Sequence, residues 1–109
     1  MDFLFVYITV PDMDTARALA RGALQQRLAA CANILPQMTS MYEWEGVLEE
    51  ASELVLILKT ASHKQEALEQ WIQAHHPYQV PCILRLPIAG GNQAYLDWLR
   101  EGLREAPPP

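Results

Sequence analysis

Apolar and polar residues are arranged along the chain in patterns that divide it into strand-like and helix-like segments. Residues 3–10 (FLFVYITV) are almost continuously apolar and rich in β-branched and aromatic side chains, which predicts a central strand covered on both faces. Pro11 and Asp12 end this strand, and Asp12 is a suitable residue to cap a following helix. Apolar residues then recur at helical spacing, so the first helix is expected over about residues 13–27.

The next segment predicts a long β-hairpin. Residues 29–45 have extended character, Gly46 supplies a turn, and residues 47–60 return to a stretch as apolar as the first strand. Pro36 interrupts the first arm, which favours an edge strand with a bulge or bend. Both arms are longer than the first strand, so part of the hairpin should extend beyond the sheet. Its backbone edges and apolar side chains would need cover from another chain, and we therefore expect a homo-oligomer.

The second half of the chain predicts a helix, a short strand and a final helix. Ser62 and Gln65 have the spacing of a capping box, an apolar stripe follows at helical spacing, and Pro77 ends the helix. Residues 81–88 (PCILRLPI) predict an edge strand, because prolines bracket its apolar residues. A third helix is expected after the glycine pair that follows.

The order of these elements predicts the fold class. It is β-α-β-β-α-β plus a C-terminal helix, the ferredoxin-like split βαβ arrangement of the α+β class, with an antiparallel sheet and a long extended hairpin. In this topology the first and third strands lie in the middle of the sheet, and the two strands that carry proline lie at its edges, where proline is tolerated. We expect a single domain over residues 1–105 and a frayed tail over residues 106–109.

Length, charge and cysteine content narrow the classes of function. A chain of 109 residues, half of them apolar, can bury one core. Eight basic against 13 acidic residues give a net charge of −5 without a basic run, so we expect no nucleic-acid partner. The first segment has neither a basic leader nor a span long enough for a bilayer. Cys31 and Cys82 form no CxxC motif, which favours free thiols in the cytoplasm.

Four segments resemble, in the same order, the signatures of the CutA family, the divalent-cation tolerance proteins. They are RLAACANILP, SMYEWEGVLEEASELVLILKT, HHPYQVPCILRLPI and YLDWL. The specific features are a Tyr-x-Trp-x-Gly turn, a Lys-Thr strand end and a His-Pro-Tyr-x-x-Pro segment, and the resemblance covers nearly the whole domain. It implies a ferredoxin-like subunit, a homotrimer built through the long hairpins and sheet edges, and tolerance to or binding of divalent metals, copper above all.

The paired histidines of AHHPYQVPC, residues 74–82, are the candidate metal site. His75 continues the apolar stripe of the second helix, whereas His76 precedes Pro77 and is pushed toward extended geometry, so the rings can converge at the helix end. Neutral imidazoles suit copper and zinc. With the family resemblance, this predicts that His75 and His76 bind copper(II) or another divalent cation, with Cys82, a neighbouring subunit or water as further ligands.

Two observations weigh against this metal site. Some bacterial members of the resembled family carry a cysteine on the first strand that has been considered a copper ligand, and this chain has Ile8 at the corresponding place. The two histidines also have a structural alternative, in which His75 meets the carboxyl end of the helix dipole and His76 hydrogen-bonds locally.

A second interpretation is a trimeric signalling or anchoring module that binds a small effector or a partner protein between subunits. Lys59 is expected to reach a carboxylate partner, and the aromatic residues near Gly46 could also serve intersubunit packing. An enzyme is not expected: a phosphatase of the acylphosphatase kind needs a glycine-rich phosphate loop with an arginine, and TVPDMD has neither. The residues that would form the effector pocket are Cys31, Tyr42, Trp44, Lys59 and Tyr78, with His76.

Overall fold

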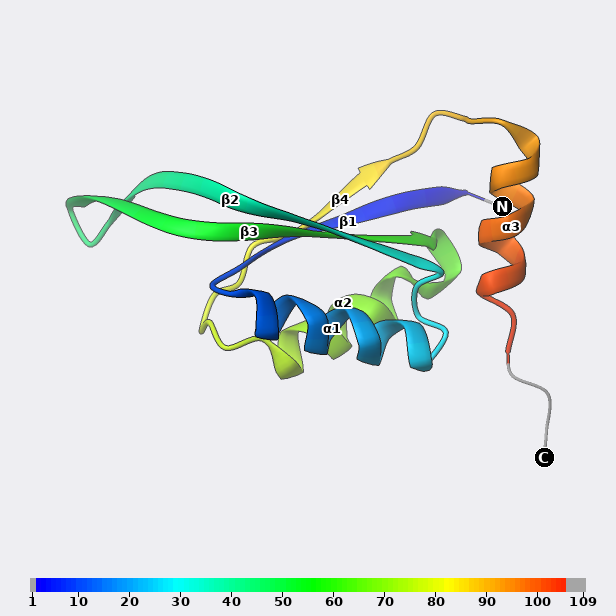
Figure 1. The fold of residues 1–109 in the computed structure, drawn as a ribbon, viewed down its shortest axis with the longest axis horizontal. Coiled ribbons are helices and arrows are strands. Elements are labelled where there is room, and N and C mark those ends of the chain that lie inside the picture. The colour runs from blue at the N-terminus through cyan, green and yellow to red at the C-terminus, as the bar shows by residue number, and fades with distance from the viewer. Residues whose placement is uncertain (1, 106–109) are drawn as a thin grey trace.

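The computed structural model describes residues 2–105, and it has the predicted order of elements (Figure 1). The expected frayed tail, residues 106–109, lies outside the described residues. None of the helices within the described range is both long and apolar enough to cross a membrane. The elements are β1 (Phe3–Val10), α1 (Met13–Gln25), β2 (Cys31–Trp44), β3 (Val47–Ala61), the 3₁₀ turn η1 (Ser62–Lys64), α2 (Gln65–His75), β4 (Ile83–Pro87) and α3 (Gln93–Gly102).

The four strands form one antiparallel sheet in the order β2-β3-β1-β4. This confirms that the first and third strands are central and that the proline-bearing strands are at the edges. Helices α1 and α2 cover one face of the sheet, as Figure 1 shows. The main core lies between them, because alternate residues of β1 and β3, such as Val6, Ile8 and Leu58, point to this face and meet Leu68 and Ile72 of α2.

The other face of the sheet is covered only at one end. There, Phe3 of β1 and Ala61 of β3 pack against Leu99 and Leu103 of α3. Within residues 2–105 the middle of this face has no covering helix, so β1 is not covered on both faces by its own chain as its apolar run predicted. We call this surface the open face. Its residues, taken from strand register and alternation, are Phe5, Tyr7, Thr9, Cys31, Asn33, Leu35, Val55, Ile57, Lys59, Leu84 and Leu86.

The β2–β3 hairpin extends beyond the sheet, as predicted. Strand β1 ends opposite Leu54, whereas β2 and β3 continue to pair from Met38 and Glu53 out to the turn (Figure 1). The predicted irregularity at Pro36 is also present, because the pairing register shifts between Leu35 and Met38. The next residue, Gln37, has a positive φ of 62°, which is where the strand bends.

The predicted N-terminal cap is present at α1 and absent at α2. The carboxylate of Asp12 accepts a hydrogen bond of 2.8 Å from the backbone N–H of Thr15, so the predicted cap of α1 is confirmed. The predicted capping box at Ser62 is wrong. Ser62 begins the 3₁₀ turn η1, Lys64 precedes α2, and neither helix start has a side-chain cap. The buried Lys64 instead forms an ion pair with Glu105.

Candidate functional site

His75 is the last residue of α2, and its ring is exposed at the helix end. Its Nδ1 lies 2.8 Å from the carbonyl oxygen of Trp71, which can only accept, so Nδ1–H is the donor. The ring also stacks on the Trp71 indole, with 4.4 Å between ring centroids. These two contacts orient the ring and leave the Nε2 lone pair of His75 without a partner among residues 2–105.

His76 is held differently, although it is the next residue. Its backbone has left the helix, with φ −78° and ψ 138°, and its side chain is only 8% exposed. Nε2–H donates to the carbonyl of Thr9 at 2.8 Å, and Nδ1 accepts the backbone N–H of Tyr78 at 3.1 Å. Both ring nitrogens are therefore engaged, and His76 fastens the end of α2 to the end of β1.

The three predicted metal ligands do not form one cluster in a single chain. Within residues 2–105 no group of three or more His, Cys, Asp or Glu side chains is close enough to hold a metal ion. The change from helical to extended backbone at His76 directs its ring to β1, while His75 remains on the helix. Of the two histidines, only His75 keeps a free ring nitrogen, and Cys82 belongs to a different site.

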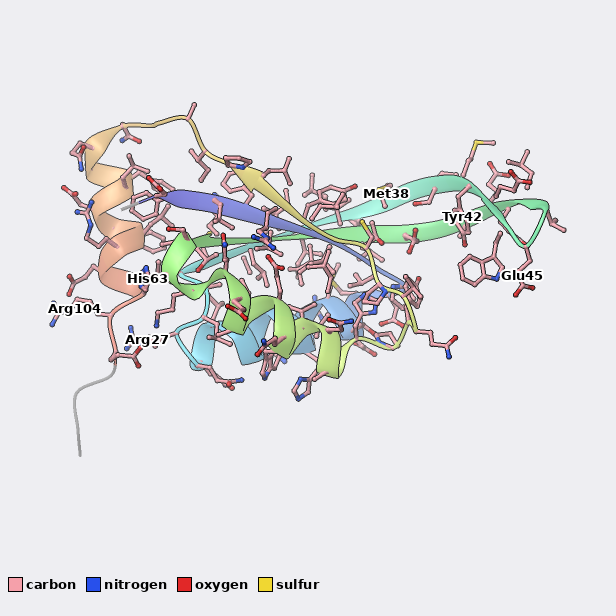
Figure 2. All side chains as sticks on the ribbon, turned by 180° about the vertical axis from the view of Figure 1, so that it is seen from behind. Arg27, Met38, Tyr42, Glu45, His63 and Arg104 are labelled. Carbon is pink, nitrogen blue, oxygen red and sulfur yellow. The ribbon has the colours of Figure 1, made fainter. Side chains whose placement is uncertain are left out.

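Cys82 lines a groove beneath the extended hairpin, which we call the hairpin groove. It has a volume of about 720 Å³, within the usual range of small-molecule sites. Figure 2 labels Tyr42 on the part of the hairpin that lies beyond the helices. The groove is lined by Thr9, Ser40, Tyr42, Trp44, Glu49, Glu53, Pro77, Tyr78, Gln79, Val80 and Cys82.

A hydrogen bond between Tyr78 and Glu53 closes the inner side of the hairpin groove. The Tyr78 hydroxyl donates to Oε2 of Glu53 at 2.9 Å, and Glu53 is only 8% exposed. Burial, and then this bond to the carboxylate, raise the pKa of Tyr78 to about 12, so the hydroxyl remains a donor at neutral pH. Sequence reasoning missed Glu53. The available signal was its place directly before the apolar run Leu54–Leu58, where burial extends back along the strand.

The predicted effector pocket is divided into two parts in the single chain. Tyr42, Trp44 and Tyr78 meet in the hairpin groove, whereas Cys31 and Lys59 are paired residues of β2 and β3 near the other end of the sheet. Lys59 pairs with Phe5 of β1, whereas the groove is lined by Thr9 of the same strand. The two groups are therefore four residues apart along β1. At about 3.4 Å per residue the separation is roughly 14 Å.

Lys59 has an aromatic environment in place of the expected carboxylate. Its Nζ donates to the hydroxyl of Tyr95 at 3.0 Å, and it lies 5.1 Å from the centroid of that ring and 5.5 Å from that of Phe5. The hydrogen bond to Tyr95 is the main cause that raises the pKa of Lys59. Within residues 2–105 no carboxylate forms an ion pair with this ammonium group.

Comparisons with known proteins match the same family over nearly the whole chain. The family model for the CutA1 divalent ion tolerance protein matches residues 4–102. The divalent-cation tolerance protein CutA of Thermus thermophilus is 51% identical over 96 residues, which cover 88% of this chain and 93% of that protein. The CutA homolog of Xenopus laevis is 46% identical over 93 residues, which cover 85% of this chain and 62% of the longer Xenopus protein.

The fold agrees with these matches. The crystal structure of CutA1 from Oryza sativa superposes on this structure with a TM-score of 0.92, at 40% identity and with 97% of each chain covered. This confirms the ferredoxin-like expectation, and the sequence identity is too high for a similarity of fold alone. The chain therefore belongs to the CutA1 divalent ion tolerance family.

Proposed function

We propose that this CutA1 family member is a cytoplasmic homotrimer that binds divalent cations, copper(II) foremost, and that acts by binding and not by catalysis. The trimer and the metal rest on different observations. The number of three subunits comes from the resemblance to CutA proteins.

The open face supports assembly. On this face Leu35 of β2 and Leu84 and Leu86 of β4 are 49%, 57% and 45% exposed. The extended hairpin exposes two further apolar side chains on its opposite side, Met41 and Leu48. Several large apolar side chains exposed on one face are typical of interaction sites. The outer edges of β2 and β4 also carry backbone groups that can pair with a neighbour.

The orientation of His75 is the observation that carries the metal proposal. A metal-bound histidine usually donates its second ring N–H to a carbonyl or carboxylate, which fixes the tautomer and the ring direction. His75 already donates Nδ1–H to the Trp71 carbonyl and presents Nε2 outward. Imidazole nitrogen suits copper(II), which is near the top of the usual affinity order. A single ligand is insufficient, so the other ligands of the proposed site come from neighbouring subunits or water.

Two further observations support the binding role and the compartment. The side-chain hydrogen bonds of His75 and His76 go to backbone groups, so within residues 2–105 neither histidine is paired with a nucleophile. Cys31 and Cys82 are free thiols, which suits a reducing cytoplasm.

Copper(II) titration with an oligomer measurement tests the proposal. We expect His75→Ala to remain trimeric by analytical ultracentrifugation and to lose most copper binding. The matched control is His63→Ala, because His63 is also exposed but lies in η1 and should leave binding unchanged. Unchanged copper affinity in His75→Ala would exclude this histidine as a ligand.

A further inference from the structure

The hairpin groove combines aromatic rings with carboxylates. Tyr42, Trp44 and Tyr78 line it together with Glu49 and Glu53, and the remaining lining residues are neutral. No Lys, Arg or His lines the groove among residues 2–105. The site is therefore negative and apolar at the same time, which is the combination that suits a positively charged organic group.

Glu53 has a single hydrogen-bond donor within the described residues. Its Oε2 accepts from Tyr78, but no described ion pair includes Glu53 or Glu49. A carboxylate that is nine-tenths buried is costly unless a positive charge compensates it. A cation in the groove would provide that compensation.

The aromatic rings add an attraction for the same charge. Trp, Tyr and Phe faces attract a cation within about 6 Å of the ring centroid, and Trp attracts it most strongly. The chain already uses this chemistry elsewhere, since the ammonium group of Lys59 is held over Phe5 and Tyr95 on the same side of the sheet. Trp44 is 54% exposed, so its ring surface is accessible.

A bare metal ion fits the groove less well. Divalent metals need several oxygen, nitrogen or sulfur ligands at short distances, and the described residues contain no group of three or more such side chains. The volume of about 720 Å³ is also much larger than an ion and is partly enclosed by Pro77, Tyr78 and Val80.

We propose that the hairpin groove binds a small organic cation of the ammonium or guanidinium class, with its charge beside Glu53 and its alkyl part against Trp44 and Tyr42. This site is separate from His75 and goes beyond the proposed copper binding. The groove shares Thr9 with the open face, so the competing occupant is a basic side chain of a neighbouring subunit.

Choline and its neutral isostere 3,3-dimethyl-1-butanol provide the test. They have nearly the same shape and differ in charge. Isothermal titration calorimetry of the full-length assembly should show choline binding at least about tenfold more tightly than the alcohol. Agmatine, which carries a guanidinium and an ammonium group, should compete with choline.

Variants locate the binding site. Glu53→Gln keeps the shape and the acceptor for Tyr78 but removes the charge, and it should weaken choline binding at least about fivefold. Trp44→Leu should also weaken choline binding, because it removes the aromatic ring against which the alkyl part packs. The control is Glu50→Gln, because Glu50 projects from the opposite face of the same strand and should leave choline affinity unchanged.

Three results would overturn the proposal. The first is equal affinity for choline and the alcohol. The second is an equal effect of Glu53→Gln and Glu50→Gln in variants that remain folded by circular dichroism. The third is no choline binding together with dissociation of the assembly in Glu53→Gln, which would assign the groove to a neighbour's basic side chain.

Discussion

Tyr78 donates a 2.9 Å hydrogen bond to Glu53 and thereby joins the segment after α2 to the part of β3 that extends beyond the sheet. This bond connects the hairpin to the loop that follows the histidines. The base of the hairpin is therefore held by a polar contact in addition to strand pairing.

Loss of this donor should destabilise the protein. In Tyr78→Phe the carboxylate of Glu53 remains buried without its hydrogen bond, so we expect the free energy of unfolding to fall by about 1–3 kcal/mol. Tyr42→Phe removes the same hydroxyl group from a more exposed groove residue, so the free energy of unfolding should change by less than about 0.5 kcal/mol. Urea denaturation at one fixed protein concentration measures both. Equal effects would mean that the Tyr78–Glu53 bond contributes little.

The same tyrosine predicts a pH dependence at alkaline pH. The folded protein holds the Tyr78 proton up to about pH 12, whereas an unfolded tyrosine loses it near the reference value of 10.0. Between these values the folded state binds more protons, so the contribution of Tyr78 to stability is complete below about pH 10 and declines as pH rises toward 12. Thermal unfolding across this window should show a smaller loss in Tyr78→Phe than in the parent. Parallel curves would contradict the raised pKa.

Assembly through the open face predicts a position-specific effect of charge. Leu84→Glu places a carboxylate on this face and should dissociate the proposed trimer, because an unpaired charge would be buried at the interface. Leu24→Glu is the control, since Leu24 is partly exposed on α1, away from the open face. Sedimentation velocity distinguishes the species. A Leu84→Glu protein that sediments like the parent would show that this face is not the interface.

Gly22 should tolerate no side chain. A Cβ at this position of α1 would overlap ring atoms of Trp71, which packs across it from α2. We expect Gly22→Ala to lower the melting temperature, with a cost of about 1–3 kcal/mol from overpacking. Gly91→Ala is the matched control, because a Cβ there meets Leu96 at an ordinary 3.7 Å. Equal melting temperatures of the two variants would indicate that the Trp71 ring moves aside freely.

The two thiols should remain separate. Cys31 is level with Phe5 in the sheet, whereas Cys82 directly precedes Ile83, which pairs with Ile8. Their separation along β1 is roughly 14 Å, about twice the Cα distance that a disulfide can bridge. Titration with a thiol reagent should count both cysteines in protein purified under reducing conditions and then freed of reductant. An intramolecular disulfide found by mass spectrometry of the folded protein would contradict this geometry.

The sequence alone was sufficient for the order of elements, the central and edge strands, the bulge at Pro36 and the family. The structural features follow from local rules: apolar periodicity, proline restrictions and turn residues act over a few neighbouring positions, and they agreed with one topology. The family came from the resemblance of four sequence segments. The capping box at Ser62 failed because the chain begins with a 3₁₀ turn there, and Ser62 gives α2 no side-chain cap.

The site depended on tertiary structure. His75 and His76 are adjacent in the sequence, but only the position of β1, which supplies the Thr9 carbonyl, determines that His76 is buried and fully hydrogen-bonded. Glu53 likewise becomes a groove residue only because Tyr78, 25 positions later, folds against it. Spacing reports which side chains share a face of one element, whereas hydrogen bonds and burial depend on which other elements pack there. For this chain the sequence determined the sheet, and the packing of the α2–β4 connection decided which of its polar side chains remain free to bind a ligand.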